Sequence, residues 1–151
     1  VFRKCDLDQI VRGEVKKFAR QFIRRKIGLR YEPLGCEVLT DEKWLAFVVE
    51  QVISNALKYT EEGEIAITLE EPRTLCIRDT GIGIAPEDLP RIFEKGYTGY
   101  NGHADKKASG IGLYLCRRIC TQLGHRIWAE SAPGVGTVIK VDLEREELQV
   151  E

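Results

Sequence analysis

Three short polar or glycine-rich segments contain the residues of this sequence that could do chemistry. They are Asn55-Ala56-Leu57-Lys58-Tyr59, Asp79-Thr80-Gly81-Ile82-Gly83-Ile84 and Ser109-Gly110-Ile111-Gly112-Leu113. Together they supply an amide oxygen, an ammonium group, a carboxylate and backbone N–H groups that glycine leaves accessible. In this order, such groups predict a pocket for a nucleotide.

Gln51, Asn55 and Lys58 form one polar stripe on a helix that is predicted for residues 41–59. At about 100° per residue, the three side chains fall within a narrow arc beside the apolar face of that helix. The Asn55 carboxamide could offer its oxygen to Mg²⁺, which prefers oxygen ligands and is usually bound together with waters and substrate phosphates. Lys58 lies one turn further on and could reach a phosphate. Taken alone, the same stripe could be an ordinary solvated face.

The two glycine-containing segments have complementary chemistry. Asp79 is predicted to end a strand, and Gly81 and Gly83 let the backbone turn sharply and approach a flat ligand. A hydrogen-bond acceptor beside a tight gap suits the amino group of adenine. Gly110 and Gly112 open a predicted helix, whose free N–H groups and dipole favour an anion. Asp-Thr-Gly is also a common turn and a single G-x-G is weak evidence, so neither segment is decisive alone.

The helices and strands that must position these segments follow from the spacing of apolar residues. Helices are predicted for residues 7–26, 41–59 and 110–123, with a shorter one at 89–93. Strands are predicted for residues 2–5, 30–34, 37–39, 65–69, 75–77, 126–131 and 136–143. The third helix is expected to bury Ile111, Leu115, Ile119 and Leu123. This order predicts an α/β (α+β) two-layer sandwich, in which a mixed sheet of about five strands carries three main helices on one face.

Size and composition exclude several classes of protein. A chain of 151 residues with 43% hydrophobic residues can bury one core, so residues 1–151 are expected to form a single domain. The net charge of -1 provides no broad basic field for nucleic acid or anionic lipid. There is no apolar run of about 18 residues and no signal-peptide pattern, so a soluble chain is expected. The five cysteines include no C-x-x-C pair, which favours cytoplasmic thiols, and Cys116 and Cys120 are expected in the core.

In order, spacing and flanking structure, these segments resemble the motifs of the histidine-kinase, gyrase and Hsp90-type ATPase superfamily, from Cys5 to Leu143. More narrowly, the chain resembles the catalytic and ATP-binding domain of a bacterial sensor histidine kinase, which has a Bergerat-type ATP-binding fold. Residues 51–59 are similar to the N box of that family, 79–83 to the G1 box, 91–95 to the F box, 109–113 to the G2 box, and 134–137 to its glycine-threonine turn. Residues 94–102 further resemble intramembrane-sensing kinases of the peptide-antibiotic response.

The resemblance implies a role for each matching residue. Asn55 would bind Mg²⁺, Tyr59 would pack on the adenine of ATP, and Asp79 would accept a hydrogen bond from the adenine amino group. Residues 95–109 would form a mobile ATP lid, which offers Lys95, Lys106 and Lys107 as cations. The implied nucleotide-binding set is Asn55, Lys58, Tyr59, Asp79, Gly81, Gly83, Ile84, Phe93, Lys95, Gly110, Ile111, Gly112, Leu113 and Thr137. The implied catalytic set is Asn55, Gln51 and Lys58.

The implied activity is transfer of the γ-phosphoryl group of Mg-ATP to a histidine on a separate dimerisation domain, which then serves a response regulator in two-component signal transduction. His103 and His125 lack the sequence context of the acceptor. We therefore expect a cytoplasmic part of a membrane-anchored, homodimeric sensor. The isolated domain is expected to be monomeric and to contact neither membrane nor nucleic acid.

Gln51 is the main departure from the family pattern. Sensor kinases commonly have asparagine at this position, whereas the ATP-hydrolysing clamps of the superfamily have a glutamate that activates water. A neutral amide is a poor general base, and Glu50 is turned away by about 100° on the helix. These features favour transfer over hydrolysis. Two alternatives remain open, namely a nucleotide-binding regulatory module without transfer and an ATP-hydrolysing clamp.

Overall fold

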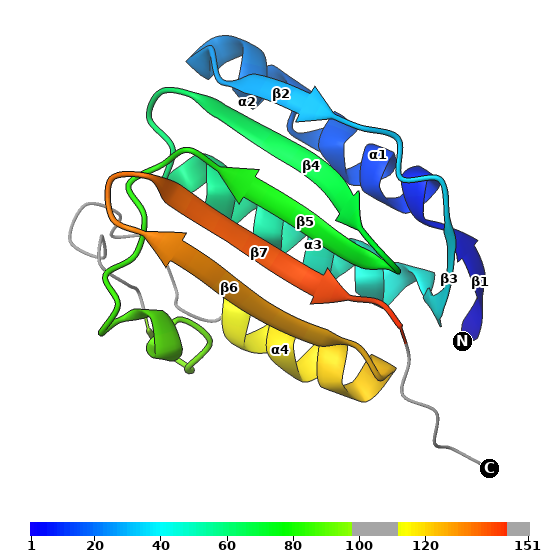
Figure 1. Ribbon diagram of the computed structural model, residues 1–151. Helices are drawn as coiled ribbons and strands as arrows, with labels where there is room; N and C mark the ends of the chain where they lie inside the picture. Colours follow the sequence, from blue (N-terminus) through cyan, green and yellow to red (C-terminus); the bar gives the residue numbers. More distant parts are fainter. Residues whose placement is uncertain (98–111, 145–151) are drawn as a thin grey trace.

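The computed structural model describes residues 1–97 and 112–144, which form two packed layers (Figure 1). The elements in chain order are β1 (Phe2–Asp6), α1 (Leu7–Lys17), α2 (Ala19–Arg25), β2 (Gly28–Tyr31), β3 (Glu37–Asp41), α3 (Glu42–Lys58), β4 (Glu64–Glu70), β5 (Thr74–Asp79), the 3-10 turn η1 (Leu89–Arg91), α4 (Gly112–Leu123), β6 (Arg126–Ala132) and β7 (Gly136–Asp142).

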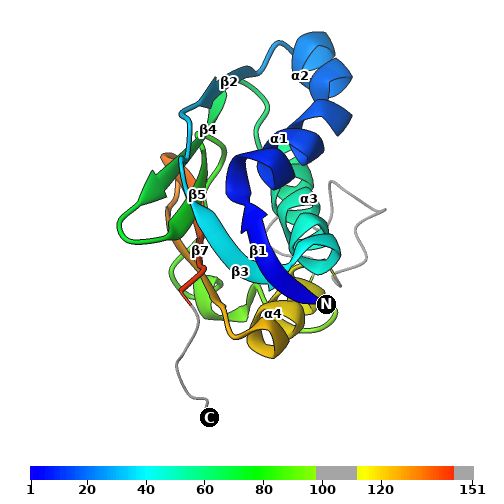
Figure 2. The same cartoon turned by 90° about the vertical axis from the view of Figure 1, so that its right-hand side faces the viewer.

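Five strands form the main sheet, in the order β2-β4-β5-β7-β6. β2 and β4 are parallel, and the other neighbouring strands are antiparallel, so the sheet is mixed. The helices lie on one face of this sheet, as the side view in Figure 2 shows. The predicted two-layer sandwich is confirmed.

β1 and β3 pair with each other in a separate antiparallel ribbon. Each strand of the ribbon leads directly into a helix. Asp6 caps α1 by accepting the N–H of Asp8 at 3.0 Å, and Asp41 caps α3 by accepting the N–H of Trp44 at 3.2 Å. The carboxylate at each strand end therefore specifies where the helix begins.

The first predicted helix is broken, and the strand that follows it begins earlier than expected. At Phe18 the N–H bonds to the carbonyl of Val15 at 3.0 Å, which ends α1 before α2 starts. Phe18 and Phe22 are both buried. Their spacing continues the apolar stripe of α1 across the break, so periodicity alone does not reveal it. The strand predicted at 30–34 lies at Gly28–Tyr31, and residues 32–36 form a loop.

α4 packs beside α3, but the prediction that Leu115 of this helix is buried is wrong. Leu115 is 37% exposed, whereas Cys116 and Cys120 are buried. The Cys116 thiol lies 3.9 Å from the carbonyl oxygen of Val48 on α3. The buried face of α4 is therefore centred on Cys116, which places Leu115 at its edge. Burial raises the pKa of both thiols, consistent with their expected role as core residues.

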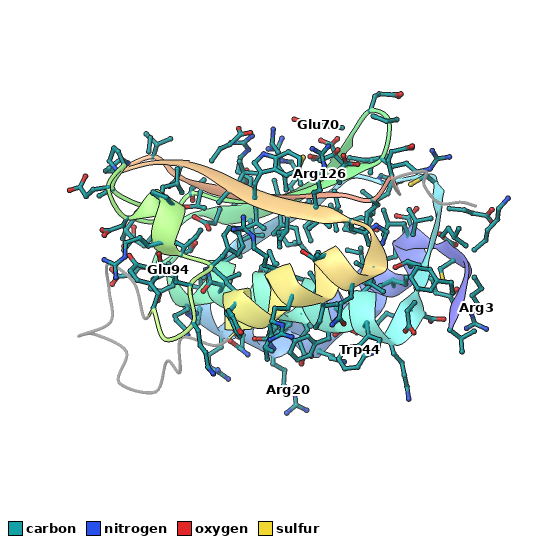
Figure 3. All side chains as sticks on the ribbon, turned by 90° about the horizontal axis from the view of Figure 1, so that it is seen from below. Arg3, Arg20, Trp44, Glu70, Glu94 and Arg126 are labelled. Carbon is teal, nitrogen blue, oxygen red and sulfur yellow. The ribbon has the colours of Figure 1, made fainter. Side chains whose placement is uncertain are left out.

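The other face of the sheet carries charged side chains. Lys140 on β7 forms ion pairs with Glu70 at 3.1 Å and Glu130 at 3.3 Å. Figure 3 shows Glu70 and Arg126 on this side, with Trp44 and Arg20 on the helix side. Val138, whose cross-strand neighbours on this face are Arg78 and Glu130, is buried although no described helix packs here. In the parts of the chain that the structure describes, no helix is long and apolar enough to cross a membrane.

Candidate nucleotide site

A row of three polar side chains crosses the end of the main sheet. Asp79 ends β5 and is the register partner of Thr137 on β7, which is in turn opposite Ser131 on β6. Side chains alternate along a strand, and Ile77 and Ile139, two positions away, are buried in the core. Asp79, Thr137 and Ser131 therefore lie on the face of the sheet that the helices cover.

Asp79 is a buried carboxylate with one oxygen engaged by the protein. Its Oδ1 accepts the N–H of Gly81 at 2.8 Å and that of Thr137 at 3.3 Å. Burial raises the pKa of Asp79, and these two hydrogen bonds oppose that rise. Within residues 1–97 and 112–144, no protein donor bonds Oδ2. Asp79 thus has an acceptor for a ligand in a largely dry position.

Ser131 is a site residue that the sequence did not reveal. Its hydroxyl accepts the N–H of Ile84 at 2.8 Å, and lies 2.9 Å from the Gly136 carbonyl oxygen and 2.8 Å from Thr137 Oγ1. It therefore fastens the 79–84 turn to the β6–β7 hairpin. A serine before a Pro-Gly turn is unremarkable by itself, but the predicted hairpin register could have placed it opposite Thr137.

Glycine is required at positions 81 and 83 because the backbone there lies against backbone atoms of other segments. A Cβ on Gly81 would overlap the carbonyl oxygen of Tyr59, and one on Gly83 would overlap that of Ala132. Gly83 also has a φ of 79°, which side chains disfavour. In addition, Ile82 donates its N–H to Tyr59 at 3.2 Å. The turn is thus pressed between the end of α3 and the β6–β7 hairpin.

The end of α3 brings its predicted polar stripe to this turn. Gln51, Asn55 and Lys58 are each half-buried. The Lys58 ammonium lies 5.9 Å from the ring centroid of Tyr59, and Tyr59 is itself buried. A Cβ on Gly112 would lie 2.7 Å from Gln51 Oε1, so the start of α4 abuts the stripe. Three segments that are distant in sequence therefore meet at one end of the sheet.

The remaining predicted residues are placed as follows. Ile84 is buried, and Leu113 is half-buried against the core. Phe93 is also buried, and the Arg117 guanidinium lies 4.2 Å from its ring centroid. Arg117 was not predicted from the sequence. Lys95 is exposed, 5.9 Å from the Tyr114 ring.

Some predictions fall outside the described residues. These are Gly110, Ile111, His103, Lys106, Lys107 and most of the proposed lid, 98–109. His125 is described. It is 3% exposed, and its Nε2 lies 2.9 Å from Thr40 Oγ1. His125 is therefore a core group at the opposite end of α4 from Gly112, which agrees with its exclusion as an acceptor.

The site is better suited to Mg²⁺ brought by a nucleotide than to a metal held by the protein alone. Among the described residues, no three His, Cys, Asp or Glu side chains form a group that could hold a metal ion. The Asn55 amide can supply one oxygen from α3. Mg²⁺ commonly takes one or two protein ligands and completes its shell with phosphates and waters. The residues present fit that mode.

Comparison with known proteins assigns the chain to a family. The family described as "Histidine kinase-, DNA gyrase B-, and HSP90-like ATPase" matches residues 40–147, which include every predicted site residue. The chain belongs to this ATPase family. Its described polar row, glycine turn and α3 stripe are therefore parts of a histidine kinase-, gyrase B- and HSP90-like ATPase domain.

Relatives of this ATPase domain include bacterial sensor kinases. It is 40% identical over 135 residues to the sensor protein BceS of Bacillus subtilis (strain 168), covering 87% of this chain and 40% of that protein. It is 37% identical over 142 residues to the sensor histidine kinase GraS of Staphylococcus haemolyticus (strain JCSC1435), covering 90% and 41%. The chain thus spans about two-fifths of the length of these relatives.

A solved structure has the same architecture as this ATPase domain. The catalytic domain of histidine kinase ThkA superposes with a TM-score of 0.80 at 25% identity, covering 95% of this chain and 97% of that one. The predicted resemblance to sensor histidine kinase catalytic domains and the predicted Bergerat-type fold are both confirmed.

Proposed function

We propose that this domain binds Mg-ATP and transfers its γ-phosphoryl group to a histidine on a separate dimerisation domain. The observation that carries the proposal is the arrangement at Asp79, whose Oδ1 is held by two backbone N–H groups while Oδ2 has no protein donor among the described residues. A buried acceptor of this kind suits the amino group of adenine. Membership of the ATPase family and the sensor kinase relatives support the assignment.

Each wall of the pocket has a role in binding. Asp79 accepts a hydrogen bond from the adenine amino group, and Tyr59 and Ile84 supply apolar surface beside the base. Asn55 offers an oxygen to Mg²⁺, and Lys58 neutralises phosphate charge. Bound Mg²⁺ contributes further charge neutralisation, which phosphoryl transfer requires together with positioning.

The α4 side of the pocket is proposed to hold the phosphates. Gly112 brings the beginning of α4 against Gln51, so backbone N–H groups at this helix start can face the phosphate end. Gly110, Ile111 and Leu113 belong to the same segment. Phe93 lies just before the proposed lid, residues 95–109, and Lys95 is the first residue of that lid. Phe93 is buried and anchors that side in the core.

Transfer is favoured over hydrolysis by the chemistry around Gln51. A carboxamide cannot take a proton from an attacking water. The neighbouring Glu50 lies on the α1 side of α3. Its charge is one of the contributions that raise the pKa of Lys17, after the larger contribution of Glu14. The carboxylate nearest in sequence is thus directed away from the pocket.

The parent protein is proposed to be a homodimeric two-component sensor. The relatives BceS and GraS, named as a sensor protein and a sensor histidine kinase, support this context. The intramembrane-sensing type is proposed from the resemblance of residues 94–102. The direct partners are then ATP and the acceptor-histidine domain of the parent, with a response regulator reached through that domain. This segment is proposed to act on the cytoplasmic side without contacting the membrane.

The test combines the domain with Mg²⁺, γ-labelled ATP and the separately purified acceptor domain of its parent. Acid-labile label on the acceptor histidine is the expected result. Nucleotide binding without label would instead support a regulatory module. Rapid ATP turnover by the domain alone would support the hydrolysing clamp.

A further inference from the structure

β2 is an edge strand of the main sheet, with β4 on one side (Figure 1). At its two ends, the N–H of Gly28 donates to the Gly63 carbonyl oxygen at 2.9 Å, and the next N–H after the strand, that of residue 32, donates to β4 at 3.1 Å. Alternate residues bond the neighbour in a parallel pair, so residues 28, 30 and 32 direct their main-chain groups to β4. The N–H and C=O groups of Leu29 and Tyr31 therefore point away from the sheet. No strand in the described part of the chain pairs with them.

The side chains at this edge differ between the two faces of the sheet. Tyr31 lies on the face that the helices cover, because its hydroxyl donates to Asp8 of α1. Leu29, two residues earlier, shares that face and is 39% exposed. Arg30 points to the opposite face, where its guanidinium lies 3.5 Å from the Glu64 carboxylate. A strand placed beside β2 would thus meet an apolar side chain on one face and a cation on the other.

The segment that leads into β2 is strongly basic. Residues 12–30 contain eight lysines and arginines and one glutamate, whereas the whole chain has 23 basic and 24 acidic residues. The glutamate, Glu14, is already paired with Lys17 at 3.0 Å. Lys26 is exposed and has no ion pair with any described residue, and Ile23 on α2 is 77% exposed. This corner therefore combines local positive charge with exposed apolar surface.

Lys26 occupies a position that usually belongs to glycine. It ends α2 with a φ of 57°, its N–H bonds the carbonyl oxygen of Ile23, and the N–H of Ile27 bonds that of Phe22. This is the Schellman arrangement, in which the left-handed residue is commonly glycine because a Cβ is disfavoured there. Lysine at this position adds a cation beside β2 at the expense of the helix end.

We propose that the open edge of β2 docks an extended segment of a partner protein in which acidic and apolar residues alternate. The segment adds a strand to the main sheet and bonds the outward N–H and C=O groups of Leu29 and Tyr31. Its apolar side chains lie on the face of Leu29, and its acidic side chains lie on the face of Arg30. A lipid surface offers no main-chain groups at strand spacing, so the edge favours a peptide. The proposal does not depend on the binding of ATP.

The probe is a fluorescein-labelled peptide of alternating glutamate and valine, about six residues long, which is a common strand length. The control peptide has lysine in place of glutamate. Fluorescence anisotropy with the 151-residue chain should show binding of the acidic peptide, and binding of the basic one at least about tenfold weaker. In amide hydrogen exchange followed by NMR, the acidic peptide should slow Leu29 and Tyr31. Arg30 should not change, because its N–H already faces β4.

Leu29→Pro and Leu29→Ala separate the main-chain contribution from that of the side chain. Both variants lose the leucine side chain, but only proline also removes the outward N–H, and it leaves the bonds to β4 in place. Leu29→Pro should bind the acidic peptide about tenfold more weakly than Leu29→Ala, because a peptide carbonyl loses its donor. Arg30→Glu should weaken binding of the acidic peptide and strengthen binding of the basic one.

Absence of binding by the acidic peptide would overturn the proposal, and so would unchanged exchange at Leu29 and Tyr31. Equal affinities of Leu29→Pro and Leu29→Ala would exclude strand addition. If Leu29→Pro does not fold, Arg30→Glu is the second test, and unchanged affinity for both peptides would contradict the proposed charge preference. Binding to phosphatidylcholine vesicles that contain phosphatidylglycerol, without binding of either peptide, would identify a lipid surface as the partner instead.

Discussion

The guanidinium carbon of Arg117 lies 4.2 Å from the centroid of the Phe93 ring. Phe93 precedes the proposed lid and Arg117 follows it on α4. Arg117 also donates to the carbonyl oxygen of Ile127 at 3.2 Å, which adds β6 to the contact. One side chain thus holds together both sides of the lid segment and the edge of the sheet.

Arg117→Leu is expected to lower the free energy of unfolding by about 1 kcal/mol, because a cation–π contact and a hydrogen bond are lost. Urea denaturation would measure the change. Arg118→Leu is the matched control, since Arg118 is exposed one residue further along α4 and contacts Tyr114 at the surface. An Arg117→Leu variant as stable as wild type would show that the Phe93 contact and the Ile127 hydrogen bond contribute nothing.

Asp79→Asn is expected to weaken ATP binding without destabilising the fold. The variant can keep an acceptor at Oδ1 but places an amide donor where Oδ2 stands, so Kd should rise by at least about tenfold, or about 1.4 kcal/mol. Burial raises the pKa of Asp79 when the protein is folded, so ionised Asp79 opposes folding as pH rises through that pKa. The neutral variant should therefore be at least as stable as wild type at pH 7.

Calorimetric titration and thermal melting would measure these two effects separately. Glu62→Gln, at an exposed carboxylate, is the control for the change of net charge. Unchanged ATP affinity in Asp79→Asn would contradict the adenine assignment. A large fall in Tm would contradict the argument from burial.

Asn55→Ala is expected to remove most of the Mg²⁺ dependence of nucleotide affinity, since the amide oxygen is the proposed protein ligand. ATP would be titrated with Mg²⁺ and with EDTA in both proteins. Ser54→Ala, one residue earlier and also half-buried, is the control. If Asn55→Ala responds to Mg²⁺ as wild type does, the metal assignment is wrong.

Gly81→Ala is expected to destabilise the domain by more than about 2 kcal/mol, because its Cβ would overlap the Tyr59 carbonyl oxygen. Gly13→Ala is the opposite case. Gly13 lies inside α1, and no atom lies within 4 Å of its added Cβ. Alanine should stabilise that helix by about 0.5–1 kcal/mol. Denaturant melts of both variants would test the contrast, and a harmless Gly81→Ala would show that the turn can move.

Asp8 is expected to stabilise the fold in a pH-dependent manner. It accepts hydrogen bonds from Tyr31 Oη and from the N–H groups of Leu34 at 3.0 Å and Gly35 at 2.9 Å. Burial alone would raise the pKa of Asp8, but these bonds and the Arg12 charge outweigh it and lower the pKa. The stabilisation is therefore complete above the ordinary pKa of 3.8 and is lost as pH falls through the lower folded value.

Asp8→Asn should cost about 1–2 kcal/mol at pH 7. The difference from wild type should shrink on acidification below pH 4, which urea melts at several pH values would show. A difference that stays constant with pH would exclude the carboxylate charge as its source.

Predictions of individual elements were correct where the deciding interactions lie between residues close in sequence, and failed where contacts between distant segments decide. The spacing of Leu45, Val49 and Ile53 predicted α3, because burial against one surface selects residues at the helical period. The same argument predicted that Leu115 would be buried, and this prediction is wrong because Leu115 is 37% exposed. A helix face tolerates either of two adjacent apolar positions, and only the packing of Cys116 against Val48 determines which one is buried.

The sequence by itself determined the fold class and the chemical groups at the site, since periodicity specifies the layers and residue type specifies each donor or acceptor. Tertiary structure decided what those groups contact. Ile84 and Ser131 are 47 residues apart, and no local pattern predicts their hydrogen bond. Arg117 over Phe93 and Gly81 against Tyr59 are of the same kind. They exist because the sheet register and the packing of α3 and α4 bring distant segments within contact distance.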